Sequence, residues 1–253
     1  MAFAVDVAFT TKPDDPAPAW QDITQYVSAA GGSRIRIDHG RPDEFSQAQP
    51  ANCQMTLNNA DGRFTAGLSS SPYYPNVKMG RRIRVFADTA GNLLSSEASS
   101  FEGGTTDAWA TYGTGGATIA NSTTQAWSGT HSLRVTWTTS LQGAQLPLAD
   151  LAIGATYTIS AYVYVGGVTG SSVGIGVAGI GTSSTRTSWN NTWGRLSYTF
   201  TATASSHLLQ VSIIGATSRT DYIDAVMLER SGSVSPFTGT AAADSRFVGY
   251  VDS

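Results

Sequence analysis

The stretch Cys53-Gln-Met-Thr-Leu-Asn-Asn-Ala-Asp-Gly-Arg-Phe-Thr65, followed by Gly80-Arg-Arg-Ile-Arg-Val-Phe86, differs in composition from the Ser-, Thr- and Gly-rich chain between about Leu93 and Thr240. Charged and apolar residues then return together in Asp244-Ser-Arg-Phe-Val-Gly-Tyr-Val251. A composition that changes and later returns predicts a host domain interrupted by an inserted one. We therefore expect a first part at residues 1–92, an insertion at 93–240, and a return strand within 241–253.

The length and composition of the chain favour two ordered domains. It has 253 residues, of which 41% are hydrophobic and only 13% are charged, a balance typical of globular rather than disordered proteins. A net charge of −3 provides no basic surface for a nucleic-acid backbone, so no nucleic-acid partner is expected. No apolar run approaches the roughly 20 residues that span a bilayer, and the first residues lack the pattern of a signal peptide. Neither membrane attachment nor Sec-type export is expected.

Alternation of apolar and polar residues predicts that both domains are all-β. Before residue 92 the predicted strands lie in 3–9, 33–38, 53–57 and 82–86. In the middle part they lie in 117–119, 132–137, 157–164, 173–177, 194–200, 208–213 and 222–228. Short strands separated by turn residues are typical of a sandwich or jelly roll. Within that fold, Leu133, Val135 and Trp137 are expected to point into the core.

Several spaced motifs of the outer segments resemble siphophage and prophage minor tail proteins of the tail-tip, distal-tail or hub-like kind. The motifs are Trp20-x-Asp-Ile-Thr-x-Tyr-Val27, Cys53-x-x-Thr-Leu-Asn-Asn-x-Asp-Gly-Arg-Phe64, Ser71-Pro-Tyr-Tyr-Pro75, Gly80-Arg-x-Ile-Arg-Val85 and Phe247-Val-Gly-Tyr-Val-Asp252. The resemblance implies a tail-hub-like β-barrel, or sandwich, that the return strand completes. It also implies a ring with copies of itself and other tail proteins at the virion tail tip, assembled in the host cytoplasm. Arg81, Arg82 and Arg84 are expected to form a solvated strand face or, alternatively, a subunit contact.

The middle segment resembles carbohydrate-binding modules of the galactose-binding-like jelly-roll type. The resemblance rests on Asn92-Leu-Leu, Ser100-Phe-Glu-Gly-Gly104, Trp127-Ser-Gly-Thr-His-Ser-Leu-Arg-Val135 and Asp221-Tyr-Ile-Asp-Ala-Val-Met-Leu-Glu229. It implies a structural calcium ion held by Glu102 and Asp224, with carbonyl oxygens around Ser100 and from Ser128 to His131 as further ligands. The alternative is that both carboxylates are solvated at strand ends.

Sugar recognition requires flat aromatic rings against the C–H faces of pyranoses, with polar groups at the hydroxyls. The expected exposed aromatic residues are Tyr112, Tyr162, Tyr164 and Trp189, with Gln145 and Arg186 as polar partners. Trp193 precedes a predicted strand and is expected to be a core residue.

Catalysis is not expected. His39, His131 and His207 stand in no nucleophile motif, and the middle segment has few carboxylates that could pair as in a glycosidase. The predicted function is a structural component of a phage or phage-like tail tip that displays a non-catalytic glycan-binding module for attachment to the host cell surface. Two alternatives remain: a purely structural tail protein with a decorative or clamp module, and a fragment of a secreted carbohydrate-active enzyme.

Overall fold

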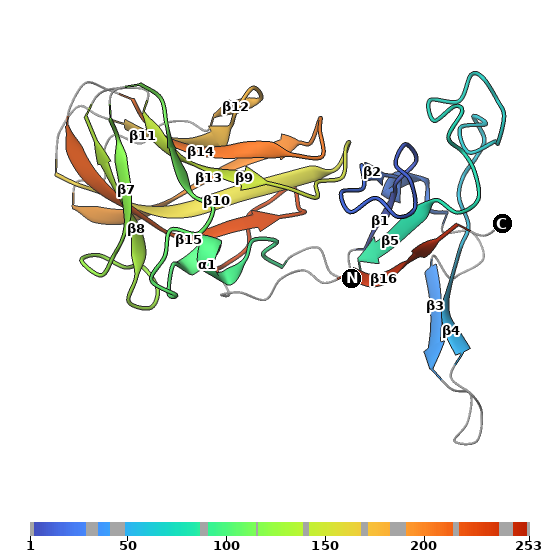
Figure 1. The fold of residues 1–253 in the computed structure, drawn as a ribbon, viewed down its shortest axis with the longest axis horizontal. Coiled ribbons are helices and arrows are strands. Elements are labelled where there is room, and N and C mark those ends of the chain that lie inside the picture. Colours follow the sequence, from blue (N-terminus) through green and yellow to red (C-terminus); the bar gives the residue numbers. More distant parts are fainter. Residues whose placement is uncertain are drawn as a thin grey trace. The chain divides into compact units, whose positions relative to one another are not determined.

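A computed structural model of the chain describes residues 3–28, 35–40, 49–86, 91–114, 116–138, 142–167, 172–182, 191–214, 218–237 and 245–251. The chain divides into two compact units, residues 1–88 with 244–253 and residues 89–243. The first unit therefore combines both ends of the chain (Figure 1). Asn92 lies in the second unit. The boundary expected from the sequence places it at the end of the first part. The buried side-chain amide of Asn92 donates to Ser99 Oγ and to the carbonyl oxygen of Val226.

One antiparallel sheet organises the first unit. Its order is β16 (Ser245–Tyr250), β5 (Arg82–Phe86), β1 (Ala4–Val7) and β2 (Gln21–Asp22). The return strand β16 runs along β5, with Phe247 opposite Val85 and Val248 opposite Arg84. This sheet therefore needs chain segments that precede and follow the second unit in the sequence.

The described residues of the first unit form an open sheet and a separate ribbon, so the expected tail-hub-like barrel or sandwich is not confirmed. β3 (Ile35–Gly40) and β4 (Gln49–Met55) pair with each other as a separate ribbon. An isolated bridge from Val27 to Leu57 links the ribbon region to the segment after the short 3-10 helix η1 (Thr24–Tyr26). A closed barrel requires that the hydrogen-bonded ladder continue across both edges of the sheet. The edge strand β2 has only two residues and does not continue the ladder. Ile37 and Cys53 of the ribbon still pack against the core of this unit.

Arg82 and Arg84 on β5, and Arg81 just before it, contact other parts of the first unit. Arg84 Nε donates to the buried carboxylate of Asp6 at 2.8 Å, and its guanidinium lies 4.3 Å from the centroid of the Trp20 ring. Arg81 and Arg82 donate to backbone carbonyl oxygens, those of Asn76, Thr11 and Asp15. These intramolecular contacts hold all three side chains, which are partly buried and so do not form the fully solvated face that the sequence predicts.

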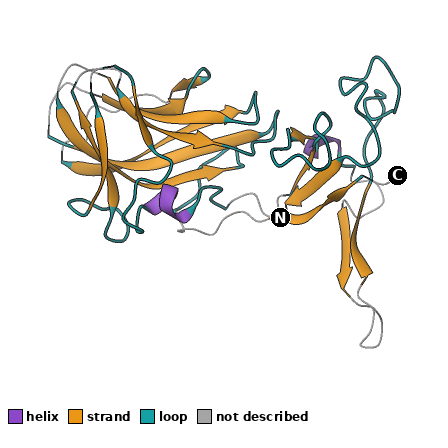
Figure 2. Ribbon diagram, viewed as in Figure 1, coloured by secondary structure: helices purple, strands orange, loops and turns teal. Residues whose placement is uncertain are grey.

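Two five-stranded antiparallel sheets form the second unit (Figure 2). The β10 sheet has the order β13 (Thr192–Thr201), β10 (Thr156–Val165), β15 (Arg219–Glu229), β8 (Ser132–Trp137) and β7 (Thr118–Ser122). The β14 sheet has the order β12 (Gly181–Thr182), β11 (Ser172–Val177), β14 (His207–Ile214), β9 (Gly143–Leu148) and β6 (Ala110–Tyr112). This confirms the predicted all-β, jelly-roll-like sandwich. None of the helices in the described part of the chain combines the length and apolar composition of a membrane span.

The core of the second unit follows the alternation of the sequence. Leu133, Val135 and Trp137 are fully buried, as predicted. Strands β6, β9 and β12 are not predicted by the sequence, and β9 shows why. Its Gly143 and Pro147 are poor strand formers, but pairing with β14 and burial of the intervening apolar residues hold it in the sheet.

Candidate functional site

The β10 sheet has an outer face that collects aromatic residues. On β10, Ile159, Ala161 and Val163 are fully buried, so Tyr162 and Tyr164 point away from the core. Antiparallel pairing aligns residues of four adjacent strands across this face. This cross-strand row is Arg134 on β8, Tyr222 on β15, Tyr164 on β10 and Trp193 on β13.

The aromatic rings of the cross-strand row contact one another edge to face. The ring centroids of Tyr164 and Trp193 lie 5.7 Å apart at an interplanar angle of 63°, and those of Tyr164 and Tyr222 lie 5.9 Å apart at 74°. Both arrangements are favourable for aromatic pairs. Neighbouring strands are about 4.8 Å apart, so the three steps from Arg134 to Trp193 cover about 14 Å. The row is long enough to contact several sugar units of one chain.

Trp127 adds a flat surface beside this row. Its ring stacks on Tyr162, with centroids 4.0 Å apart and an interplanar angle of 11°, and lies 6.3 Å from the ring of Trp193. Trp127 is 46% exposed, more than any other tryptophan among the described residues. Trp127, Tyr162, Tyr164, Trp193 and Tyr222 together form what we call the aromatic platform.

Asp224 ties the loop that carries Trp127 to the sheet. It is fully buried on β15, and its Oδ2 accepts the backbone N–H groups of Trp127 at 2.8 Å and Ser128 at 3.0 Å. The next residue, Ala225, has a φ of 50°, a conformation uncommon for residues other than glycine. The irregular backbone of β15 and the bonds to Asp224 therefore place Trp127 over Tyr162.

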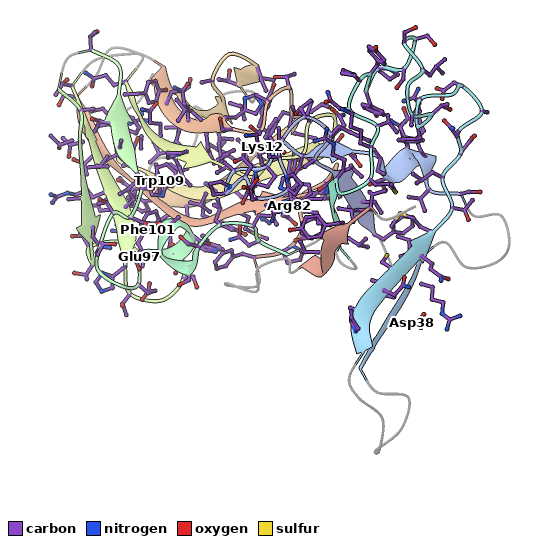
Figure 3. The ribbon with its side chains drawn as sticks, turned by 45° about the vertical axis from the view of Figure 1, so that its right-hand side comes forward. Lys12, Asp38, Arg82, Glu97, Phe101 and Trp109 are labelled. Carbon is purple, nitrogen blue, oxygen red and sulfur yellow. The ribbon has the colours of Figure 1, made fainter. Side chains whose placement is uncertain are left out.

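Helix α1 (Ser96–Ser100) anchors the segment that delivers Glu102. Figure 3 labels Glu97, Phe101 and Trp109 in this region. Trp109 Nε1 donates to the carbonyl oxygen of Ala98 at 2.9 Å, and Phe101 is fully buried with a φ of 61° at the helix C-terminus. The chain turns sharply at Phe101, so the next side chain, Glu102, lies outside the core.

Glu102 and Asp224 both accept backbone N–H groups from the loop that carries Trp127. Asp224 binds the start of this loop, and Glu102 binds its end. The Glu102 carboxylate accepts the N–H groups of Thr130 at 3.0 Å and His131 at 2.9 Å. Desolvation opposes ionisation of Glu102, but these bonds outweigh it and lower the pKa of that carboxyl. Burial raises the pKa of Asp224 to about 6, and the charge of Glu102 acts in the same direction. The two carboxylates therefore repel each other.

The structure places Glu102 and Asp224, two of the expected calcium ligands, close enough for their charges to interact. Ser128 donates its backbone N–H to Asp224 and His131 donates its own to Glu102. Ser100 Oγ donates to the carbonyl oxygen of Ser96 within α1. Among the described residues, no three His, Cys, Asp or Glu side chains gather closely enough to hold a metal. The carboxylate pair is the part of the site that fits a cation, since it concentrates negative charge.

Two other expected sugar-binding residues lie on the β14 sheet and so cannot join Tyr162 and Tyr164. The ring of Tyr112 on β6 covers Gly143, where even a Cβ atom would clash with it. Burial raises the pKa of Tyr112, although a hydrogen bond with Ser212 opposes this. Gln145 Oε1 accepts a bond from Gln210 Nε2 at 3.4 Å.

Three expected positions remain: Trp189, Arg186 and Trp193. Trp189 and Arg186 fall outside the described residues. The sequence predicts Trp193 in the core, but buried Leu196 fixes the inward positions of β13, and Trp193 belongs to the opposite set. The same alternation, started from the apolar Ile223, would have placed Tyr222 outward. No local sequence pattern indicates that Trp127 is exposed.

Comparisons with known proteins concern mainly the second unit. Residues 94–219, which lie within it, match the family model described as "Carbohydrate binding domain". No curated protein matches the chain.

Similar solved structures include the C-terminal family 22 carbohydrate binding module of Clostridium thermocellum Xyn10B, with 23% identity, a TM-score of 0.49, and coverage of 59% of this chain and 99% of that one. The CBM22-1 xylan-binding domain of Paenibacillus barcinonensis Xyn10C has 24% identity, a TM-score of 0.46, and coverage of 58% and 100%. The enzymatically active domain of tailspike protein 4 of bacteriophage CBA120 has 12% identity, a TM-score of 0.40, and coverage of 54% and 21%.

Proposed function

We propose that the second unit is a non-catalytic carbohydrate-binding module. The observation that carries this proposal is the aromatic platform, in which rings from three adjacent strands meet an exposed tryptophan held by Asp224. Aromatic faces pack favourably against the C–H faces of pyranoses, and fixed rings lose little freedom when a ligand binds. The match of residues 94–219 to the carbohydrate binding domain family supports the same class of ligand.

We propose further that the first unit is the tail-protein part of a virion tail tip and that it displays the module toward the host envelope. The motifs from Trp20 to Val85 and from Phe247 to Asp252 support this assignment by resemblance. The topology is compatible with display, because the chain leaves the first sheet after β5 and returns to it as β16. Copies in a ring would add avidity, since tethered sites raise the effective concentration.

Binding of the full chain to a glycan array tests the module. Wild-type protein is expected to retain at least one cell-surface polysaccharide, and Tyr164→Ala is expected to weaken that binding about 10-fold or more, because a central ring of the platform is lost. Tyr250→Ala removes a tyrosine that is 58% exposed in the first unit and serves as the matched control, with unchanged binding expected.

Three outcomes of this array would contradict the proposal. Folded wild-type protein that retains no glycan would favour the purely structural tail protein. Loss of binding in Gln145→Ala, but not in Tyr164→Ala, would move the site to the β14 sheet. Hydrolysis of a retained glycan would favour the carbohydrate-active enzyme.

A structural calcium ion is a separate proposal, with Glu102 and Asp224 as the residues that would hold it. Bound calcium would supply positive charge that offsets their repulsion. We expect the melting temperature to be several degrees higher in calcium than in EGTA, since a ligand at 100 times its Kd stabilises by about 2.7 kcal/mol. The shift should be smaller at about pH 5 than at about pH 7.5, because protons compete for Asp224, whose pKa is raised to about 6.

Glu102→Gln is expected to abolish the calcium shift while it keeps an acceptor oxygen for Thr130. Equal melting temperatures of the wild-type protein in calcium and in EGTA would reject the ion. In that case, the backbone N–H bonds alone would attach the loop to Glu102 and Asp224.

A further inference from the structure

Two arginines flank the aromatic platform. Arg134 is exposed and begins the cross-strand row, next to Tyr222. Arg195 pairs with Tyr162 across β13 and β10, and its guanidinium lies 5.4 Å from the centroid of that ring. The rings of the platform thus lie between two positive charges.

Arg195 is held in place by uncharged partners. Its Nη1 donates to the carbonyl oxygen of Ser235 at 2.6 Å and its Nη2 to Ser160 Oγ at 2.9 Å. Its Nε is buried and has no hydrogen-bond partner. Glu229 also bonds Ser235, but it is fully buried and forms no ion pair with Arg195. The charge of Arg195 is therefore fixed beside Tyr162 without a direct counterion.

The outward side of the β10 sheet exposes an arginine and buries its carboxylates. Among the described residues of its five strands, the outward positions hold Arg134 and Arg195 and no exposed Asp or Glu. Asp224 and Glu229 also lie on this side, but both are buried, Asp224 beneath the Trp127 loop and Glu229 against Ser235. No ion pair joins Arg134 to any described carboxylate. Among the described residues of these strands, the exposed charge on this face is therefore that of Arg134, in a chain whose net charge is −3.

We propose that the aromatic platform binds an anionic polysaccharide, with Arg134 pairing an acidic group and Arg195 adding fixed positive charge beside Tyr162, while the rings stack on its sugars. The inference rests on the proposed carbohydrate-binding function and names its class of ligand. A guanidinium matches carboxylate and phosphate oxygens with two parallel N–H donors. An acidic group can meet Arg134 at one end of the platform while the sugars extend along the row to Trp193, about 14 Å away.

Affinity electrophoresis of the full chain separates charge from sugar shape. The probes are polygalacturonate, its fully methyl-esterified form, and a glucosylated wall teichoic acid, which carries phosphodiesters. We expect retention by polygalacturonate, by teichoic acid or by both, at least 10-fold weaker retention by the ester, and weakening as NaCl rises from about 50 to about 500 mM. The stronger of the two anionic probes identifies carboxylate or phosphate as the preferred group.

Arg134→Gln is the decisive variant, because an exposed side chain can be changed without disturbing the core. It is expected to weaken retention by the anionic probe about 10-fold. Arg36→Gln, at an exposed arginine of the first unit, is the matched control and should change nothing.

Three results would overturn the inference. The first is equal retention by polygalacturonate and its ester. The second is anionic retention that survives the double variant Arg134→Gln, Arg195→Gln. In both cases, a Tyr164-dependent glycan on the array would leave the proposed function intact. The third is the absence of any glycan ligand for the folded chain, which would overturn both.

Discussion

Replacement of Asp221 by alanine is expected to lower the free energy of unfolding of the second unit by about 3–5 kcal/mol. Asp221 is fully buried, and its Oδ2 accepts bonds from Arg219 Nε at 2.9 Å and Trp137 Nε1 at 2.8 Å. Its Oδ1 accepts the N–H of Gly166 at 2.8 Å. Alanine would leave the buried Arg219 guanidinium without its countercharge and leave two further donors without an acceptor.

Urea unfolding followed by tryptophan fluorescence measures this loss. Arg219 Nη1 and Nη2 are buried and have no hydrogen-bond partner, so the charge of Arg219 depends heavily on Asp221. The double variant Asp221→Ala, Arg219→Met removes the charge as well and should therefore be more stable than Asp221→Ala alone. A loss below about 1 kcal/mol in the single variant would contradict this account.

Truncation of the chain after residue 243 is expected to abolish the cooperative unfolding of the first unit and to spare that of the second. Strand β16 pairs along the whole of β5, so its removal exposes β5 as an edge. The N–H of Gly80 and the carbonyl oxygen of Arg81 would also lose their partners on Val251. Three strands would remain in the sheet, one of them the two-residue β2, which is too little for independent stability.

Differential scanning calorimetry distinguishes the two units if the full chain and the truncated chain are compared side by side. The full chain should show the transitions of both units, and the truncated chain that of the second unit alone. Val248→Thr keeps the backbone of β16 and changes a side chain that is 52% exposed, so it should preserve both transitions. An unchanged first-unit transition after truncation would show that β16 is dispensable.

The fold of the second unit was predictable from the sequence wherever a strand had a clear period of two. Leu133, Val135 and Trp137 illustrate this, because alternate residues of a strand must face opposite sides. β9 escaped prediction because Gly143 and Pro147 mask its alternation, and β6 and β12 are too short to show a period. The barrel or sandwich expected of the first unit stays a prediction, because closure depends on pairing between distant strands.

The candidate site was predictable in smaller part. Tyr162 and Tyr164 were identified as exposed aromatic residues, and alternation on β10 turns both outward. Tyr112 and Gln145 carried similar local signals but belong to the other sheet. No local pattern tells which sheet a strand will join, since that choice depends on the pairing and packing of the whole domain.

The sequence by itself determined which side of each clear strand is apolar and that a Ser-, Thr- and Gly-rich segment interrupts a chain of different composition. These are consequences of local backbone geometry and of composition. The tertiary structure alone decided that Arg134, Tyr222, Tyr164 and Trp193 form one row, and that Asp224 holds Trp127 beside it. Register and loop attachment come from hydrogen bonds between residues far apart in the chain, and those partners exist only when the sheets have assembled.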